Sequence, residues 1–257
     1  MESNWIENKI VIVAGGASGI GQAIAYEAAE QGAVVIIADI DEKNGNATAN
    51  RIKANSNNAT FIKTDVTKLE SVAEMVSQAN SIGPIKYLAC SAGSQSYGDV
   101  ESTTEEAWDK CMDINLKSMF LLSKEILPEL KTNGGGGIVN ISSIQGLRCQ
   151  KNVLAYATSK GAVIAMTRAM GLDYAKQGIS VNCICPGSVD TPMLRFGAGE
   201  HGDVDEVLSK WASHHPIGRI GTPQEIAKTT MFLWSPDSNF IVGQAIIADG
   251  GLGSVIL

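Results

Sequence analysis

Three residues in the middle of the chain have the types and the spacing needed to move a proton. Tyr156 and Lys160 are four residues apart near the start of a stretch with helical periodicity, so their side chains share one face of that helix. Ser143 lies 13 residues before Tyr156, at the end of an apolar stretch typical of a strand. Because open parallel sheets bind ligands at the carboxyl ends of their strands, we expect the three side chains to face one site.

These residue types suit hydride transfer between an alcohol carbon and a nicotinamide, since that reaction needs a partner for the hydroxyl proton. A free tyrosine has a pKa of about 10 and is a poor base at neutral pH. A lysine cation about 4 Å away contributes about 4 kcal/mol at an effective dielectric constant of about 20, which lowers the pKa of the phenol by at most about three. Tyr156 is therefore the predicted acid and base, Lys160 the activating cation, and Ser143 the residue that orients the substrate oxygen.

A glycine-rich turn near the start of the chain has the features of a dinucleotide-binding turn. An apolar stretch over residues 10–14 runs into Gly15, Gly19 and Gly21, and a helical stretch follows directly. Gly15 permits a tight turn, Gly19 lets the backbone approach a ligand, and Gly21 allows the helix to pack closely on the strand. The free N–H groups at the start of that helix favour a pyrophosphate.

An acidic residue follows the second apolar stretch at the distance expected for a ribose contact. Asp39 lies 18 residues after Gly21, where a carboxylate accepts hydrogen bonds from both ribose hydroxyls of NAD and repels the 2′-phosphate of NADP. Asp41 is a nearby alternative, and either acid could simply be solvated at the end of a strand. The preceding glycines favour the ribose role for Asp39. Asp65 and Val66, after the third apolar stretch, are expected beside the adenine ring.

The elements that must position these residues alternate regularly along the chain. Nearly continuous apolar stretches, typical of strands covered on both faces, occupy residues 10–14, 34–38, 60–63, 87–90, 137–141, 180–184 and 244–248. Helical periodicity is clearest in residues 21–31, 69–82, 104–130, 153–177 and 223–233. This alternation predicts one α/β domain over residues 1–257, with a doubly wound parallel sheet and helices on both faces. Residues 188–216, which lack a firm assignment, are predicted to form a substrate loop or lid.

Composition and charge argue against several other classes of protein. The 257 residues include 20 Lys and Arg against 27 Asp and Glu, a net charge of −7, which disfavours nucleic-acid binding. No apolar run reaches the length of about 18 residues that a membrane span needs, and the start of the chain has no secretion signal. The five cysteines are odd in number and mostly lie in apolar stretches, as expected for reduced thiols of a cytoplasmic protein. Cys183 and Cys185 have too few partners nearby for a zinc site. The three histidines also lack the spacing of metal ligands and are expected to lie in loops.

With these motifs in place, the sequence resembles the short-chain dehydrogenase/reductase family of the Tyr-x3-Lys type over essentially the whole chain. The resemblance implies seven parallel strands in the order 3-2-1-4-5-6-7 and a homotetramer. It also implies that Asn115 holds a water molecule in a proton relay through Lys160. The sequence departs from the family pattern at two places: Ala14 replaces a threonine before the glycine turn, and Cys90-Ser91 replaces an Asn-Asn pair after the fourth strand.

The resemblance also implies which residues bind the cofactor, taken to be NAD. Among them, Val189 and Thr191 are expected to contact the nicotinamide carboxamide. The full predicted set is Gly15, Ser18, Gly19, Ile20, Gly21, Asp39, Asp65, Val66, Ser91, Ala92, Gly93, Tyr156, Lys160, Pro186, Gly187, Val189 and Thr191.

The substrate is expected to be a secondary alcohol or ketone that is small and polar or anionic. Gln95 and Arg195 occupy positions where hydroxybutyrate dehydrogenases of this family bind a carboxylate, although Gln145 replaces the characteristic histidine of those enzymes. The predicted substrate residues are Gln95, Ser143, Gln145, Arg148 and Arg195. Two alternatives stay open: a 3-oxoacyl reductase that uses NADPH, which Asp39 opposes, and a non-catalytic NAD-binding module. The spacing of the Tyr-Lys pair argues against the enoyl-reductase branch.

Overall fold

The computed structural model describes residues 5–255, and its centre is one sheet of seven parallel strands. The strand order is β3-β2-β1-β4-β5-β6-β7, which confirms the expected order. Every predicted strand is present with bounds within two residues of those expected. The strands are β1 (Ile10–Ala14), β2 (Val34–Asp39), β3 (Asn58–Lys63), β4 (Ile85–Cys90), β5 (Gly136–Ile141), β6 (Ile179–Pro186) and β7 (Ala245–Ala248).

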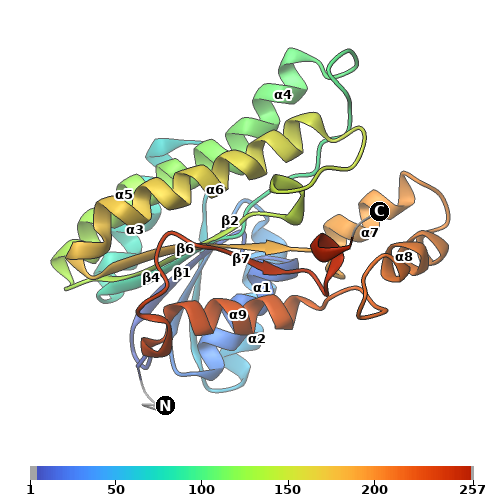
Figure 1. The fold of residues 1–257 in the computed structure, drawn as a ribbon. Helices are drawn as coiled ribbons and strands as arrows, with labels where there is room; N and C mark the ends of the chain where they lie inside the picture. The colour runs from blue at the N-terminus through green and yellow to red at the C-terminus, as the bar shows by residue number, and fades with distance from the viewer. Residues whose placement is uncertain (1–4, 256–257) are drawn as a thin grey trace.

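Helices cover both faces of this sheet, as Figure 1 shows. One face carries α1 (Gly19–Glu30), α2 (Glu42–Ala54) and α9 (Pro223–Trp234). The other carries α3 (Leu69–Ile82), α4 (Glu105–Met112), α5 (Ser118–Thr132) and α6 (Leu154–Tyr174). Two short helices, α7 (Pro192–Gly199) and α8 (Val204–Ser213), lie apart from these layers, beyond the end of β6 (Figure 1).

The continuous apolar character of β1 follows from this double covering. Side chains of a strand alternate between the two faces of a sheet. Val11 and Val13 pack into the core beneath α1 and α9, whereas Ile10 and Ile12 pack into the core beneath α3 and α5. All of them are at most 1% exposed. Both cores therefore require apolar residues from the same strand, so no polar alternation appears in the sequence.

Two segments differ from the pattern predicted by the sequence. The helix expected over residues 104–130 is divided by a π-helical turn, Asp113–Lys117, between α4 and α5. The stretch expected to be a loop contains α7 and α8. Capping signals mark both of these short helices: the side chain of Thr191 accepts a hydrogen bond from the backbone of Leu194, and that of Asp203 accepts two from the first turn of α8.

Candidate functional site

The glycine turn between β1 and α1 brings the start of the helix close to the sheet. A Cβ on Gly15, which has a φ of +81°, would lie 2.4 Å from the backbone nitrogen of Ala92. A Cβ on Gly21 would lie 2.0 Å from the carbonyl oxygen of Gly15. Ser18 caps α1 without a side-chain hydrogen bond, so the first N–H groups of the helix have no side-chain cap. The turn therefore presents backbone donors where a pyrophosphate would bind.

Asp39 lies at the end of β2 and is tied to this turn. Its carboxylate accepts a hydrogen bond of 3.0 Å from the backbone N–H of Ala17 and another of 3.0 Å from the N–H of Asp41. The rival acid, Asp41, instead caps α2 by accepting a hydrogen bond from the N–H of Asn44. Asp39 is half-buried and Ile40, next to it, is 63% exposed. Of the two acids, only Asp39 faces the cavity described below.

Ser143, Tyr156 and Lys160 lie together where β5 ends. Ser143 is buried and follows β5 by two residues, and its hydroxyl accepts a hydrogen bond of 3.1 Å from the N–H of Gln145. Tyr156 and Lys160 lie in the first two turns of α6. The ammonium of Lys160 lies 5.7 Å from the centre of the Tyr156 ring and donates a hydrogen bond of 2.9 Å to the carbonyl oxygen of Ile141.

The electrostatics of the site differ from the expectation from the sequence. Burial raises the pKa of Tyr156 to about 12, and the neighbouring Ser143 hydroxyl offsets this only in part. Burial lowers the pKa of Lys160 to about 8. The pKa of the phenol is therefore raised and not lowered, because desolvation is the largest effect on it.

Asn115 is fully buried within the π-helical turn, near the lysine. Its side chain accepts a hydrogen bond of 2.7 Å from the N–H of Ser94 and donates to the carbonyl oxygen of Ser94 and to the hydroxyl of Ser159. These bonds connect the loop after β4 with α6. A π-helical turn inside a longer helix is often found at a functional site. The position suits the relay role expected for Asn115, which stays a prediction.

One cavity of about 1120 Å³ connects the glycine turn with the Tyr156 phenol, a volume at the upper end of the range typical of small-molecule pockets. Every predicted cofactor residue lines it except Gly21, which packs behind the turn. Asn115 lies behind its wall. The predicted residues that line the cavity are Gly15, Ser18, Gly19, Ile20, Asp39, Asp65, Val66, Ser91, Ala92, Gly93, Gln95, Ser143, Tyr156, Lys160, Pro186, Gly187, Val189 and Thr191.

Three predicted substrate residues lie outside this lining. Arg195 forms a two-pronged ion pair with Asp190, with distances of 2.7 and 2.8 Å, and its side chain is 51% exposed. Arg148 is exposed, and the side chain of Gln145 accepts a hydrogen bond from the backbone of Gln150. The structure thus does not bring these three residues to the cavity, because local partners or solvent hold them elsewhere.

Aromatic residues from two segments that the sequence places around the substrate, 94–97 and 192–215, form a further part of the site. Tyr97 and Trp211 both line the cavity, and the ring of His201 lies between them, with centroid distances of 5.4 Å to Tyr97 and 6.1 Å to Trp211. These contacts connect the loop after β4 with α8. His215 lies in the loop that follows α8, as expected, and is buried there. No local sequence signal marks the contact of Tyr97 with His201, since the two residues are about a hundred positions apart.

Residues 5–255 contain neither a candidate metal centre nor a candidate membrane-spanning helix. No cluster of three or more histidine, cysteine or acidic side chains is suited to hold a metal ion in this part of the chain. None of the helices described is long and apolar enough to span a bilayer. Four of the five cysteines are buried and unpaired, whereas Cys149 is exposed.

The chain is similar to known oxidoreductases over nearly its whole length. A family model described as enoyl-(acyl carrier protein) reductase matches residues 15–253. A 2-(S)-hydroxypropyl-CoM dehydrogenase of Xanthobacter autotrophicus is 34% identical over 98% of this chain and 100% of its own length.

Two solved structures share the whole fold. The aldohexose dehydrogenase of Thermoplasma acidophilum, in ligand-free form, is 35% identical with a TM-score of 0.91, covering 98% of this chain and 97% of that one. A variant of the actinorhodin polyketide ketoreductase, crystallised with NADPH, is 29% identical with a TM-score of 0.93 and covers 96% and 98% of the two chains.

Proposed function

The chain belongs to the short-chain dehydrogenase/reductase family, and from that premise we propose that it transfers a hydride between NAD(H) and a secondary alcohol or ketone. The family assignment makes the protein an oxidoreductase for alcohol-type substrates. The proposal is carried by one observation: a continuous cavity joins the glycine turn to the cluster of Ser143, Tyr156 and Lys160. A non-catalytic NAD-binding module would not need that cluster.

The residues present fit a nicotinamide dinucleotide. The uncapped start of α1 suits its pyrophosphate, Asp39 its adenosine ribose, and the loop with Val189 and Thr191 its nicotinamide. The cofactor would accept or supply the hydride. Tyr156 would take the hydroxyl proton during oxidation and return it during reduction, while Ser143 would hold the substrate oxygen. Lys160 would stabilise the phenolate, assisted by the positive charge of an oxidised nicotinamide.

We propose NAD rather than NADP as the cofactor because of the carboxylate of Asp39. An Asp39→Asn variant removes the charge and keeps an oxygen that can accept the Ala17 N–H. We expect the ratio of NADP to NAD affinity to rise about tenfold to a hundredfold. NAD would lose charge-assisted hydrogen bonds to its ribose, and NADP would no longer be repelled through its 2′-phosphate. Fluorescence titration with both dinucleotides measures this ratio, and Asp41→Asn is the matched control that leaves it unchanged. A clear preference of the unaltered protein for NADPH would refute the proposal and favour a 3-oxoacyl reductase.

The substrate class is best tested with a panel of secondary alcohols, hydroxy acids and sugar alcohols, read by NADH absorbance. The described cavity lining contains Lys110 and Lys160 but no arginine, and it contains the aromatic rings of Tyr97 and Trp211. This composition supports a small polar hydroxy compound and gives less support to the anionic one expected from Arg195. Turnover of no alcohol or ketone despite tight NAD binding would favour the non-catalytic module.

Arg195 provides a specific test of the anionic alternative. Because its guanidinium is paired with Asp190 and lies outside the cavity lining, we expect Arg195→Ala to change the KM of a turned-over substrate by less than about twofold. Steady-state kinetics on the best substrate of the panel measures this. An increase of KM confined to anionic substrates would restore the carboxylate role of Arg195.

We further propose that residues 1–257 form one domain in which residues 188–216 cover the substrate. The contacts of His201 with Tyr97 and Trp211 support this role, since they hold α8 against the loop after β4. Protection of this segment from proteolysis by NAD and substrate would test it.

A homotetramer in the cytoplasm completes the proposal. Large apolar side chains on the surface support self-association, among them Phe240 and Leu172, which are 104% and 84% exposed. The unpaired cysteines support a reducing compartment. We expect light scattering of the purified protein to show a particle of four chains. A monomer would contradict the proposed homotetramer.

A further inference from the structure

The loop between β6 and α7 determines where a nicotinamide would rest if the proposed function holds. Gly187, Val189 and Thr191 line the cavity, and Val189 is only 5% exposed. A loop needs partners for its backbone groups to keep a fixed position. The N–H of Gly187 donates to the carbonyl oxygen of Ala248 in β7, whereas the partners of Ser188 and Asp190 come from residues 215–225, which do not line the cavity.

Gly221 forms two backbone hydrogen bonds with the loop, on either side of Val189. Its N–H donates to the carbonyl oxygen of Ser188 at 2.8 Å, and its carbonyl oxygen accepts from the N–H of Asp190 at 2.9 Å. Val189 and Gly221 thus form an isolated parallel bridge. The place of the Gly221 backbone in the fold therefore determines where the backbone of Val189 lies.

His215 provides the third bond to the loop. Its Nε2 accepts a hydrogen bond of 3.1 Å from the N–H of Ser188, and its Nδ1 lies 2.9 Å from the carbonyl oxygen of Trp211. Because a backbone N–H only donates and a carbonyl only accepts, these partners assign a neutral ring with the proton on Nδ1. His215 is 3% exposed, so this connection between α8 and the loop is shielded from water.

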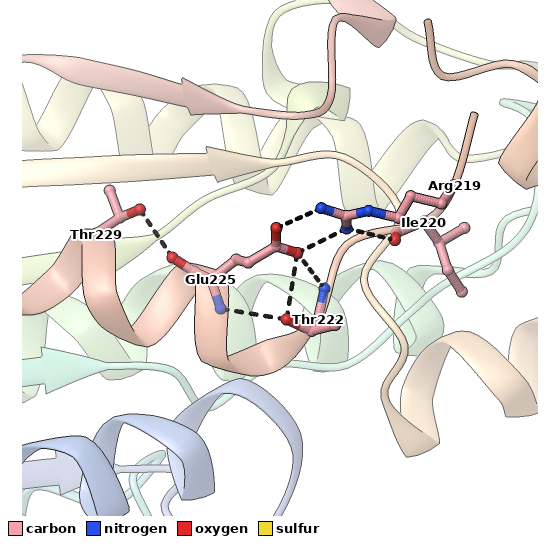
Figure 2. Close-up of polar contacts among 5 residues, drawn as sticks. All are labelled: Arg219, Ile220, Thr222, Glu225 and Thr229. Carbon is pink, nitrogen blue, oxygen red and sulfur yellow. Dashed lines mark hydrogen bonds and ion pairs between the residues drawn. The ribbon is translucent and has the colours of Figure 1, made fainter. Parts of the chain in front are cut away.

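A polar cluster at the start of α9 fixes the residues on both sides of Gly221 (Figure 2). The guanidinium of Arg219 makes two bonds of 2.9 and 2.7 Å to the carboxylate of Glu225 and a third, of 3.2 Å, to the carbonyl oxygen of Ile220. The same carboxylate accepts hydrogen bonds from the backbone N–H of Thr222, at 2.8 Å, and from its hydroxyl. Ile220 and Thr222 are thus both bound to one ion pair, with Gly221 between them.

We propose that residues 215–225 are a positioning segment for the nicotinamide side of the cofactor site, with Arg219 and Glu225 as its positioning residues. The two side chains are 50% and 48% exposed, and exposed ion pairs contribute little to stability. Their contribution is to hold Gly221 in register with Ser188 and Asp190. The segment acts through the loop and touches neither cofactor nor substrate.

Glu225→Gln tests this inference through two ligands that share all but the nicotinamide end. NAD probes the whole site, whereas ADP-ribose probes only the glycine turn and the adenosine side. We expect the dissociation constant of NAD to rise about threefold to tenfold and that of ADP-ribose to change by less than about twofold. Glu42→Gln, the same substitution in the exposed ion pair of Glu42 with Lys63, is the matched control and should change neither.

Arg219→Lys is the second variant, because lysine keeps the charge and cannot make the paired bonds to Glu225 together with the bond to Ile220. It should weaken NAD binding in the same selective way. Equal weakening of both ligands, or no change in either, would overturn the inference, since a merely structural role does not distinguish them. Failure of the unaltered protein to bind NAD or NADP would instead overturn the proposed function and this inference with it. If only NADP binds, NADP and 2′-phospho-ADP-ribose serve as the matched ligands.

Discussion

Tyr156→Phe will lower kcat by about a thousandfold and leave the dissociation constant of NAD within about twofold of its original value. General acid–base catalysis contributes about a hundredfold to ten-thousandfold, and phenylalanine retains the ring but has no proton to exchange. The pyrophosphate and the adenosine ribose are expected at the glycine turn and at Asp39, on elements other than α6, so loss of the phenol hydroxyl should leave their binding intact. Steady-state kinetics with the best substrate, combined with fluorescence titration of NAD, measures both quantities.

Tyr97→Phe is the matched control, since it removes the other tyrosine hydroxyl of the same cavity. We expect a change in KM with kcat within about tenfold, because Tyr97 lines the cavity but has no part in the proposed proton transfer. Retention of activity by Tyr156→Phe would assign the proton transfer to another group. An equal loss in both variants would indicate a general disturbance of the cavity.

Gly21→Ala will weaken NAD binding about tenfold or more and lower the melting temperature by about 4–10 °C. The added Cβ would lie 2.0 Å from the carbonyl oxygen of Gly15, so α1 must move away from the turn. Backbone at that contact cannot give way as the end of a flexible side chain could. Displacing α1 moves the N–H groups expected to bind the pyrophosphate, even though Gly21 itself does not line the cavity.

Gly83→Ala serves as the control for the loss of a glycine as such. Gly83 has an extended backbone, with a φ of 169°, and a Cβ there would lie 3.5 Å from the side chain of Ile10, an ordinary contact. We expect unchanged NAD affinity. Thermal unfolding and NAD titration of both variants provide the comparison, and normal NAD binding by Gly21→Ala would refute the role assigned to this glycine.

The sequence predicted the sheet well, and the residues that it assigned to a cofactor line one cavity except for Gly21, because the signals of both are local. The strands are short apolar stretches between helices, and strand order followed from the family resemblance. The glycine turn, Asp39 and the Tyr156–Lys160 pair each lie within one or two adjacent elements, where spacing alone determines which side chains share a face.

Three of the five predicted substrate residues do not line the cavity, because their positions depend on contacts that the sequence pattern does not show. Arg195 has the charge expected of a carboxylate-binding residue, but Asp190, five residues earlier, occupies its guanidinium. The aromatic contact of Tyr97 with His201 and the hydrogen bond of His215 to Ser188 join residues that no spacing rule relates.

The π-helical turn Asp113–Lys117 has a consequence for how this protein could change in evolution. Such a turn is equivalent to one residue inserted into an ordinary helix. Because the turn takes up the additional residue locally, deleting one residue there would restore a regular helix and leave α4 and α5 close to their present phase. The loss would fall on the turn itself, where Ile114 lines the cavity and Asn115 is bonded to Ser94 and Ser159. A single-residue deletion is therefore expected to keep the fold but be selected against in this turn, whereas it is expected to be tolerated in the exposed linker around Gly202.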